Sequence, residues 1–528
     1  MKRSDYGLLS LVAVLFFSLL ATLQKEPGYM DAEYYFGQSI QLVQHHTLAE
    51  PFIWNYLNDP AGLPVPGFAF WLPATSFIAA GGQWILGTTS FFAAKLFFIL
   101  MASSTAVMAA YFATIFLPGR RAGWLAGLLT LFSGFYLPFM TITDTFTPYM
   151  FLGGLFFVCI WQAEKRNNNS AKINYWFIFL GIVAGIMSLT RSDGLLWLAG
   201  GWLGVILNYG INVKTLKKIA LHLLFVLLGF TLVMGPWYIR NIALYHALFP
   251  TGNGLMAWLT KYDDLFVYPS SLVTISRWSG VGIGTIAVDR LKALSSNLQT
   301  LIASGGVILL TPMMVIGLWK ERKRTMIKTA LVMLLVTLAV MSLVFPYAGE
   351  RGGFFHSLSA VQVILWSLVP VGLDAIIQWG VKHRDWKTER SWKMFGTALV
   401  VAAGLFSAFI LADKLQNGTE NGIPWNQTMA ANTLVEETLF EIAGDRNDAI
   451  MVNDPPGYTL ATGRPSIMTP SGGAKAIIEA GTRYGAHYLV LNEERMDVQT
   501  QMDENALMAE HFVFLFEAAG NKVYEYKP

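Results

Sequence analysis

The sequence predicts a mostly α-helical, polytopic membrane protein of about 11 transmembrane helices, with a large first outer loop and a small C-terminal α/β soluble domain. Of its 528 residues, 54% are hydrophobic and 13% are charged, whereas soluble domains carry roughly 25% charged residues. Apolar runs of about 20 residues recur along the chain, and each can cross a hydrocarbon layer of about 30 Å. The last part of the chain is instead polar and acidic.

The expected spans lie near residues 6–23, 92–117, 122–142, 147–163, 173–190, 193–209, 219–239, 298–319, 327–346, 356–379 and 394–412. Basic clusters occupy every second connection, at Lys2-Arg3, Arg120-Arg121, Lys165-Arg166, Lys214 to Lys218, Lys320 to Lys328 and Lys382 to Lys393. Because cytoplasmic loops are enriched in Lys and Arg, we expect a multi-pass protein of the plasma (inner) membrane with a cytoplasmic N-terminus and an extracytoplasmic tail. The first apolar run lacks the small-residue cleavage pattern of a signal peptide, which favours an uncleaved span.

One further apolar segment, Phe68 to Leu86, could also span the membrane. Counting it would reverse the side of every later loop and of five basic clusters. It contains Pro73 and Gly81-Gly82, which suit short interfacial helices better than a straight span. We therefore expect two long outer loops, at residues 24–91 and 240–297, within a membrane domain of residues 1–412.

Residues 413–528 are expected to form a separate extracytoplasmic domain. This segment has 8 Lys/Arg against 17 Asp/Glu, and its roughly 115 residues are enough to fold alone. Its patterns predict helices near 428–443 and 474–484, a turn at Pro455-Pro456-Gly457, and four strands, at 449–453, 487–492, 512–517 and 523–526. The single cysteine, Cys159, excludes a disulfide framework, and the basic loops are typical of membrane topology and not of nucleic-acid binding.

Carboxylates directly after the first span are the leading candidates for chemistry. Asp31 and Glu33 open the first outer loop, and Asp144 lies at the next outward connection. Cationic or donor groups that could bind a phosphate follow on other outward connections, at Arg191, Arg240, Lys261, Arg351 and His356. Side chains that could contact substrate are Tyr34, Tyr35, Trp54, Asp263 and Asp264.

Structural roles are the alternative for several of these groups. Arg191 could simply pair with Asp193, the acids Asp263-Asp264 could form a solvated loop face, and His356 could make a polar contact at a helix start.

The order of these motifs resembles the GT-C glycosyltransferases, membrane enzymes that use polyprenyl-phosphate sugars, and especially the protein O-mannosyltransferases and the lipid A aminoarabinose transferase. The resemblance covers roughly residues 1–412. It rests on Asp31-Ala32-Glu33-Tyr34, the Pro60-to-Trp71 loop, Thr143-Asp144, Arg191-Ser192-Asp193-Gly194 and Pro236-Trp237-Tyr238-Ile239-Arg240-Asn241.

The resemblance implies an inverting transfer of a sugar from a polyprenyl-phosphate donor to a hydroxyl of a lipid, glycan or protein at the outer face. The phosphate leaves as an anion, so one base suffices, and we assign it to Asp31, with Asp144 orienting the acceptor or sharing that role and Glu33 third. A glycoside hydrolase would need a general acid as well.

Two departures from the family leave the identity of the base and of one phosphate contact undecided. Asn58-Asp59-Pro60 stands where the aminoarabinose transferase carries a lysine before the proline, and the acids are spaced Asp-x-Glu and not adjacent as in the mannosyltransferases. Either Asp31 or Glu33 could thus face the substrate. Asp59 could support a divalent cation, but we expect neither a metal nor another cofactor.

A transporter or flippase for a lipid-linked saccharide is the alternative function. It would place ionisable or helix-breaking residues at the midplane of several spans. The spans here are largely free of charge and the polar groups gather at one face, which favours chemistry at the membrane surface. A third hypothesis, a receptor built around the acidic tail, leaves the Asp31 motif unexplained.

Overall fold

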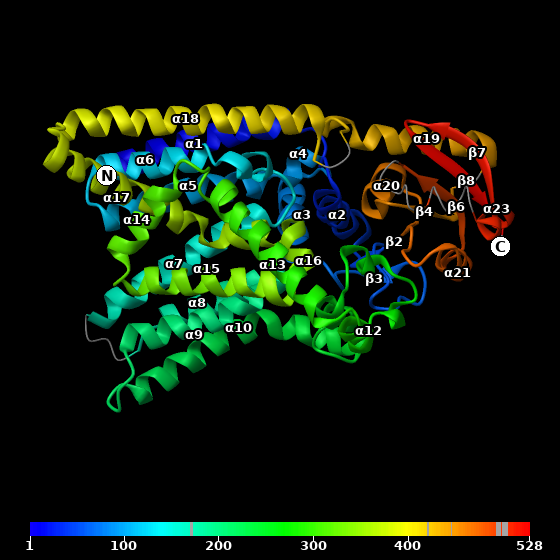
Figure 1. The fold of residues 1–528 in the computed structure, drawn as a ribbon, viewed down its shortest axis with the longest axis horizontal. Coiled ribbons are helices and arrows are strands. Elements are labelled where there is room, and N and C mark those ends of the chain that lie inside the picture. The colour runs from blue at the N-terminus through cyan, green and yellow to red at the C-terminus, as the bar shows by residue number, and fades with distance from the viewer. Residues whose placement is uncertain (169–172, 420–421, 445, 493–497, 499–504, 528) are drawn as a thin grey trace.

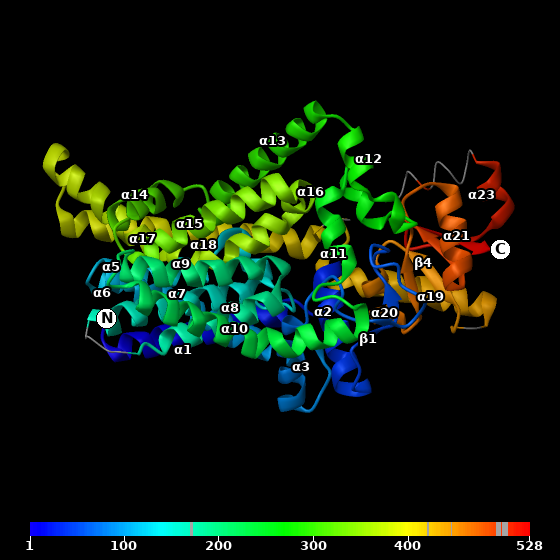
Figure 2. The ribbon, with the colours of Figure 1, turned by 90° about the horizontal axis from the view of Figure 1, so that it is seen from below.

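The computed structural model describes residues 1–168, 173–419, 422–444, 446–492, 498 and 505–527. Long helices lie side by side in a bundle, and an α/β unit formed by the end of the chain sits at one end of it (Figure 1). The N-terminus lies at the opposite end of the bundle, as do the α9–α10 and α17–α18 turns (Figure 1). A perpendicular view shows α3 and α13 projecting from the bundle on opposite sides (Figure 2).

Seven helical segments of the described chain are long and apolar enough to cross a membrane, at Arg3–Leu23, Phe91–Phe116, Phe146–Asn167, Leu216–Tyr245, Thr325–Val344, Pro346–Arg384 and Thr388–Asn417. The helices within them are α1 (Arg3–Leu23), α4 (Phe91–Ala94), α5 (Leu96–Phe116), α7 (Phe146–Asn168), α10 (Leu216–Tyr245), α15 (Thr325–Ala339), α16 (Pro346–Ala348), α17 (Phe354–Arg384) and α18 (Thr388–Asn417). The predicted helical membrane fold is therefore confirmed.

The remaining expected spans are shorter or interrupted helices. They are α6 (Arg120–Leu131) with a following 3-10 turn, α8 (Trp176–Thr190), α9 (Leu196–Tyr209), and α13 (Ile283–Thr300) with α14 (Thr311–Glu321). Between α13 and α14, Val307 and Ile308 adopt positive φ angles, which β-branched residues rarely do and which breaks the helix. Within the expected loop 240–297, α10 extends to Tyr245 and α13 begins at Ile283. Two short helices, α11 (Thr251–Leu255) and α12 (Ile275–Gly280), lie within the remaining loop.

The first outer loop begins with a helix that sequence analysis did not predict. This helix, α2 (Met30–Ile40), carries both Asp31 and Glu33 in its first turn. Three two-residue strands follow, β1 (Ala49–Glu50), β2 (Phe52–Ile53) and β3 (Val65–Pro66). The apolar segment then forms α3 (Ala74–Leu86), whose 13 residues extend only about 20 Å at 1.5 Å per residue, which is too short for a span.

The tail contains the predicted helices and strands and three further elements, α20, α23 and β5. Its helices are α19 (Thr428–Ala443), α20 (Pro455–Thr462), α21 (Ala474–Tyr484) and α23 (Ala506–His511), and its strands are β4 (Ala449–Val452), β5 (Ser466–Met468), β6 (Ala486–Leu491), β7 (Phe512–Ala518) and β8 (Asn521–Tyr526). The turn expected at Pro455 is wrong: α20 begins there, because Asp454 caps it by accepting a hydrogen bond from Gly457 N and proline suits a first helical turn. Strand β5 was not predicted.

A strand of the first outer loop completes the sheet of the tail. The strand order is β2-β5-β4-β6-β8-β7, and β2 pairs in parallel with β5 through Phe52 opposite Ser466 and Ile53 opposite Ile467. β4 is parallel to β5 and β6, whereas β8 is antiparallel to β6 and β7. The loop and the tail are therefore joined by backbone pairing.

A second tie lies where α1 passes into α2. The indole of Trp425 is fully buried there, and its Nε1 donates to Glu26 O at 2.9 Å. Gly28 has φ +85°, and a Cβ on it would lie 2.3 Å from the indole ring. Only glycine fits this contact, which holds the tail against the start of the first outer loop.

Candidate functional site

A cavity of about 430 Å³ lies where the connections between helices meet at the tail end of the bundle. It is lined from the start of α2, from the α8–α9 junction, from the loop after α10 and from the residues before α17. Six of the predicted site residues line it: Asp31, Tyr35, Trp54, Arg191, Arg351 and His356. Segments distant in sequence thus bring an acid, two arginines and a histidine to one hollow.

Asp31, Asp144 and His356 form the centre of this group. The Nε2 atom of His356 lies 3.9 Å from Asp31 Oδ2, and its Nδ1 atom lies 3.7 Å from Asp144 Oδ1. The imidazole is held in place by stacking on Phe146 with ring centroids 3.7 Å apart, and Nδ1 is 2.9 Å from Thr145 Oγ1. The Asp31 side chain is 34% exposed and that of Asp144 is 0% exposed. Asp31 is therefore the carboxylate that a substrate can reach.

Asp144 is held behind the cavity by two donors. The hydroxyl of Tyr29 and the backbone N–H of Thr145 donate to its two carboxylate oxygens. Burial and the neighbouring Asp144 carboxylate raise the pKa of Tyr29 well above its usual range, so its hydroxyl keeps its proton. Tyr29 was not predicted as a site residue, and only its position two residues before Asp31 could have pointed to it.

Arg191 is fixed by contacts on several sides. Its Nε donates to Asp193 Oδ1 at 2.9 Å, and Asp193 Oδ2 accepts a hydrogen bond from the Tyr149 hydroxyl at 3.0 Å. Its terminal nitrogens lie 3.4 Å from Thr145 Oγ1 and from Gly353 O. The pairing with Asp193 weighed above is thus present, and it holds a guanidinium at the wall of the cavity.

Arg351 reaches the same cavity from the segment before α17. Its guanidinium lies over the ring of Tyr262, 4.8 Å from the centroid, and the residue is exposed. The adjacent Gly352 has φ +104°, a backbone conformation that L side chains rarely adopt. This turn allows Arg351 and His356 to line one cavity although α17 begins between them.

An aromatic wall closes the side of the cavity toward the first outer loop. Trp54 packs against Trp71 and Phe70 with ring centroids 4.2 and 4.6 Å apart, and all three rings line the cavity with Tyr35. Such surfaces suit the apolar faces of sugars and the first units of a polyprenyl chain.

Other predicted residues lie outside the cavity lining. Tyr34 is buried and donates to Glu50, Arg240 donates to Gly67 O at 2.7 Å and lies over Trp237, and Lys261 and Asp263 are exposed. Asp264 is buried and accepts hydrogen bonds from Thr260 and from Arg277, at 2.7 Å for the latter. None of these five residues lines the cavity. The phosphate-binding roles expected for Arg240 and Lys261, and the substrate contacts expected for Tyr34, Asp263 and Asp264, stay predictions.

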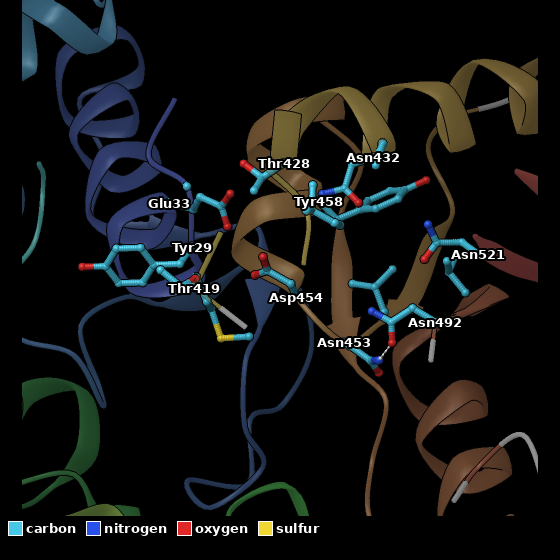
Figure 3. Close-up of a pocket in the computed structure, with 16 residues that line it drawn as sticks. Tyr29, Glu33, Thr419, Thr428, Asn432, Asn453, Asp454, Tyr458, Asn492 and Asn521 are labelled. Atoms are coloured by element: carbon cyan, nitrogen blue, oxygen red, sulfur yellow. Dashed lines mark hydrogen bonds between the residues drawn. The ribbon is translucent and has the colours of Figure 1, made fainter. Parts of the chain in front are cut away.

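Glu33 faces away from Asp31. Its side chain points toward Asp454 of the C-terminal unit and not toward the cavity (Figure 3). Residues two apart on a helix project about 200° from each other. Because Asp31 and Glu33 both lie on α2, only one of them can face the cavity, and it is Asp31.

Asp31, Asp144 and His356 could also hold a metal ion. One potential ligand atom of each lies within 4.8 Å of the others. Two carboxylates and an imidazole suit Mn²⁺ or Zn²⁺, but three ligands leave the remaining positions to water or a substrate phosphate.

No family model matches the chain, and the comparison with curated proteins found no match. Solved structures do resemble it. ArnT from Cupriavidus metallidurans bound to undecaprenyl phosphate aligns with a TM-score of 0.58 and 11% identity over 99% of this chain and 98% of that one. Archaeoglobus fulgidus oligosaccharyltransferase AglB, in complex with an inhibitory peptide and a dolichol-phosphate, aligns with a TM-score of 0.54 and 13% identity. This alignment covers 99% of this chain and 74% of AglB.

A third structure is the arabinofuranosyltransferase AftD from Mycobacteria, with a TM-score of 0.52 and 12% identity. The alignment covers 99% of this chain and 42% of AftD. All three are GT-C membrane glycosyltransferases. The chain therefore has the GT-C fold that the order of its motifs predicted.

Proposed function

We propose that this protein is an inverting membrane glycosyltransferase that moves a sugar from a polyprenyl-phosphate donor to an acceptor hydroxyl. The observation that carries the proposal is the convergence of a reachable carboxylate, Asp31, and two guanidiniums, Arg191 and Arg351, on one cavity with an aromatic wall. The polyprenyl phosphates bound to structures of the same fold support the donor class.

Asp31 is the proposed base. It takes the proton of the acceptor hydroxyl as that oxygen attacks the anomeric carbon from the side opposite the phosphate, and the bond from this carbon to the phosphate oxygen breaks. His356 lies between Asp31 and Asp144, with Nε2 3.9 Å from Asp31 Oδ2 and Nδ1 3.7 Å from Asp144 Oδ1. The departing phosphate is an anion, which Arg191 and Arg351 stabilise by charge-assisted hydrogen bonds.

We further propose that the cavity opens to the extracytoplasmic side of the plasma membrane. The turns that carry the basic clusters between α9 and α10 and between α17 and α18 lie at the end of the bundle away from the tail (Figure 1). The positive-inside rule then assigns that end to the cytoplasm and the tail end, with the cavity, to the outside.

The decisive experiment is transfer by Asp31→Asn in proteoliposomes supplied with a polyprenyl-phosphate sugar and an acceptor. Removing a general base lowers rates by about 10²- to 10⁴-fold, and we expect a loss of at least that size with normal expression. Glu33→Gln, on the opposite face of α2, is the matched variant and should retain transfer. Full activity of Asp31→Asn would remove the base assignment, and movement of the lipid-linked sugar across the bilayer without any product would favour the flippase instead.

We also propose that transfer needs no metal at Asp31, Asp144 and His356, because the two arginines can neutralise the departing phosphate. Activity should persist after treatment with a chelator. Activity lost on chelation and restored by Mn²⁺, in the parent and in Asp454→Asn alike, would instead assign a cation to these three residues.

A further inference from the structure

A second cavity, of about 110 Å³, lies between α2 and the C-terminal unit. Glu33 enters it from α2, and Asp454, Asn453, Asn432 and Asn521 enter from the tail (Figure 3). None of the described residues that line it is basic. Two carboxylates and several amides thus share a hollow that holds no positive side chain of its own.

The two carboxylates lie close together. Asp454 Oδ1 accepts from Gly457 N at 3.0 Å and caps α20, which leaves Oδ2 for another partner. A Cβ built on Gly457 would lie 2.3 Å from Asp454 Oδ2 and 2.5 Å from Glu33 Oε2. Both oxygens therefore border the one small space that the missing side chain of Gly457 leaves open.

Two buried oxygens of residues that line this cavity have no hydrogen-bond donor among the described residues. Glu33 is 2% exposed, and its Oε2 has no hydrogen-bond partner among the described residues. The Oδ1 atom of Asn453 is likewise buried without a partner in the described chain, while its Nδ2 donates to Asn492 (Figure 3). Buried oxygens without donors are costly unless a bound group completes them.

Burial raises the pKa of Glu33 well above its usual range, and the neighbouring Asp454 carboxylate adds to the effect. Burial also raises the pKa of Asp454. The pair is therefore stable only with a proton or a cation between the two carboxylates.

We propose that Glu33 and Asp454 bind a divalent cation of the calcium type, which joins α2 to the C-terminal unit. Carboxylate and amide oxygens are the ligands that Ca²⁺ prefers, and the cavity has room for the waters that complete its 6–8 ligands. The site is distinct from the group around Asp31. The two sites are linked because α2 carries both Asp31 and Glu33. They are also linked by Tyr29, which lines this second cavity and whose hydroxyl donates a hydrogen bond to Asp144.

The test uses the full chain in detergent micelles after removal of metals with a chelator, and it does not depend on the transfer reaction. Calorimetric titration with Ca²⁺ should show one ion per chain, and Ca²⁺ should raise the unfolding temperature. Glu33→Gln and Asp454→Asn should each weaken binding at least tenfold. Gly457→Ala should do the same, because its methyl group would occupy the space between the oxygens in a helix that tolerates alanine.

Two controls separate this site from other acids. Glu437→Gln removes an exposed carboxylate of α19 and should leave Ca²⁺ binding unchanged, as should Asp31→Asn. A parent chain that binds no Ca²⁺ overturns the proposal, as does binding lost in Asp31→Asn but kept in the three site variants. If the parent binds Mg²⁺ in place of Ca²⁺, and Glu33→Gln, Asp454→Asn and Gly457→Ala weaken that binding in the same way, the site is supported and only the identity of the ion changes. If Asp454→Asn without Ca²⁺ is more stable than the Ca²⁺-saturated parent, the pair shares a proton and the proposal falls.

Discussion

At the scale of single residues, position in the cavity separates side chains that look alike in sequence. Arg240 and Arg351 both follow aromatic, outward-facing stretches. Arg351 lines the cavity, whereas Arg240 donates to Gly67 O and lies 4.4 Å from the centroid of the Trp237 ring. The first can meet a phosphate, and the second braces the first outer loop against α10.

These two arginines give a matched pair of variants. Arg351→Ala should raise the KM for the donor about tenfold or more, because a charge-assisted hydrogen bond contributes about 1.5–3 kcal/mol. Arg240→Ala should leave the donor KM unchanged and lower stability by about 1 kcal/mol. Steady-state kinetics against donor concentration measures both, and an equal rise in KM for the two variants would contradict the assignment.

A buried acid in the first outer loop predicts a dependence of stability on pH. Burial raises the pKa of Glu50 from 4.5 to about 7, although the Tyr34 hydroxyl and the Phe68 N–H both donate to its carboxylate. Between these values the folded protein holds a proton that the unfolded chain has released. The free energy of unfolding therefore falls by about 3 kcal/mol as the pH rises from 4.5 to 7. Above pH 7 this contribution no longer changes.

Glu50→Gln should remove this slope, since an amide oxygen can accept the same two hydrogen bonds without ionising. The variant should unfold at a higher temperature than the parent at pH 8, and the difference should shrink at pH 5. Identical pH profiles of the two proteins would mean that Glu50 stays ionised in the fold.

At the scale of elements, small residues set how closely the helices of the bundle approach. Helices α8 and α10 pack along their length, and a Cβ on Gly181 of α8 would lie 2.0 Å from Val226 O of α10. The reciprocal contact is made by Gly229, where a Cβ would lie 2.1 Å from Ile178 O. Such close backbone approach is how helices associate in a membrane, where apolar burial contributes little.

Gly181→Ala should therefore force α8 and α10 apart and destabilise the protein by about 1–3 kcal/mol. Gly235→Ala on the same helix α10 is the control, because its Cβ would meet only Thr231 Cγ2, at 3.7 Å. The buried Cys159 provides the readout, since a thiol reagent should reach it at lower temperature in Gly181→Ala only. Equal reactivity of Cys159 in the two variants would contradict the close approach of α8 and α10 at Gly181.

At the scale of the whole molecule, the first outer loop and the tail form one structure above the bundle. The loop contributes β2 to the sheet of the tail, and Trp425 of the tail packs at Gly28. Sequence-distant segments thus fix α2, and with it Asp31, relative to the helix ends that carry Asp144, Arg191 and His356.

The proposed orientation can be tested by cysteine labelling in a Cys159→Ser background. Thr88→Cys after α3 and Glu437→Cys on α19 should react with a membrane-impermeant reagent from outside, and Lys387→Cys at the α17–α18 turn only after permeabilisation. All three positions are exposed. Labelling of position 88 only from inside would mean that the α3 segment crosses the membrane and that the predicted topology is wrong.

The sequence by itself determined the membrane class, the order of the motifs that resemble GT-C enzymes, and most elements of the tail. These follow from local hydropathy and periodicity, which need no knowledge of distant partners. It did not reveal α2, whose N-cap residue, Tyr29, makes no side-chain hydrogen bond to the first turn. Without that helix, the sequence could not show that Asp31 and Glu33 face opposite directions.

Tertiary structure alone decided that Asp31 faces the cavity and Glu33 the tail, that Arg240 lies outside it, and that β2 belongs to the tail's sheet. Each of these facts depends on contacts between segments far apart in the chain. Phe52 and Ser466, for example, pair across more than four hundred residues. A strand of two residues carries no periodic pattern, so its partner is set by the space that the folded bundle and tail leave for it.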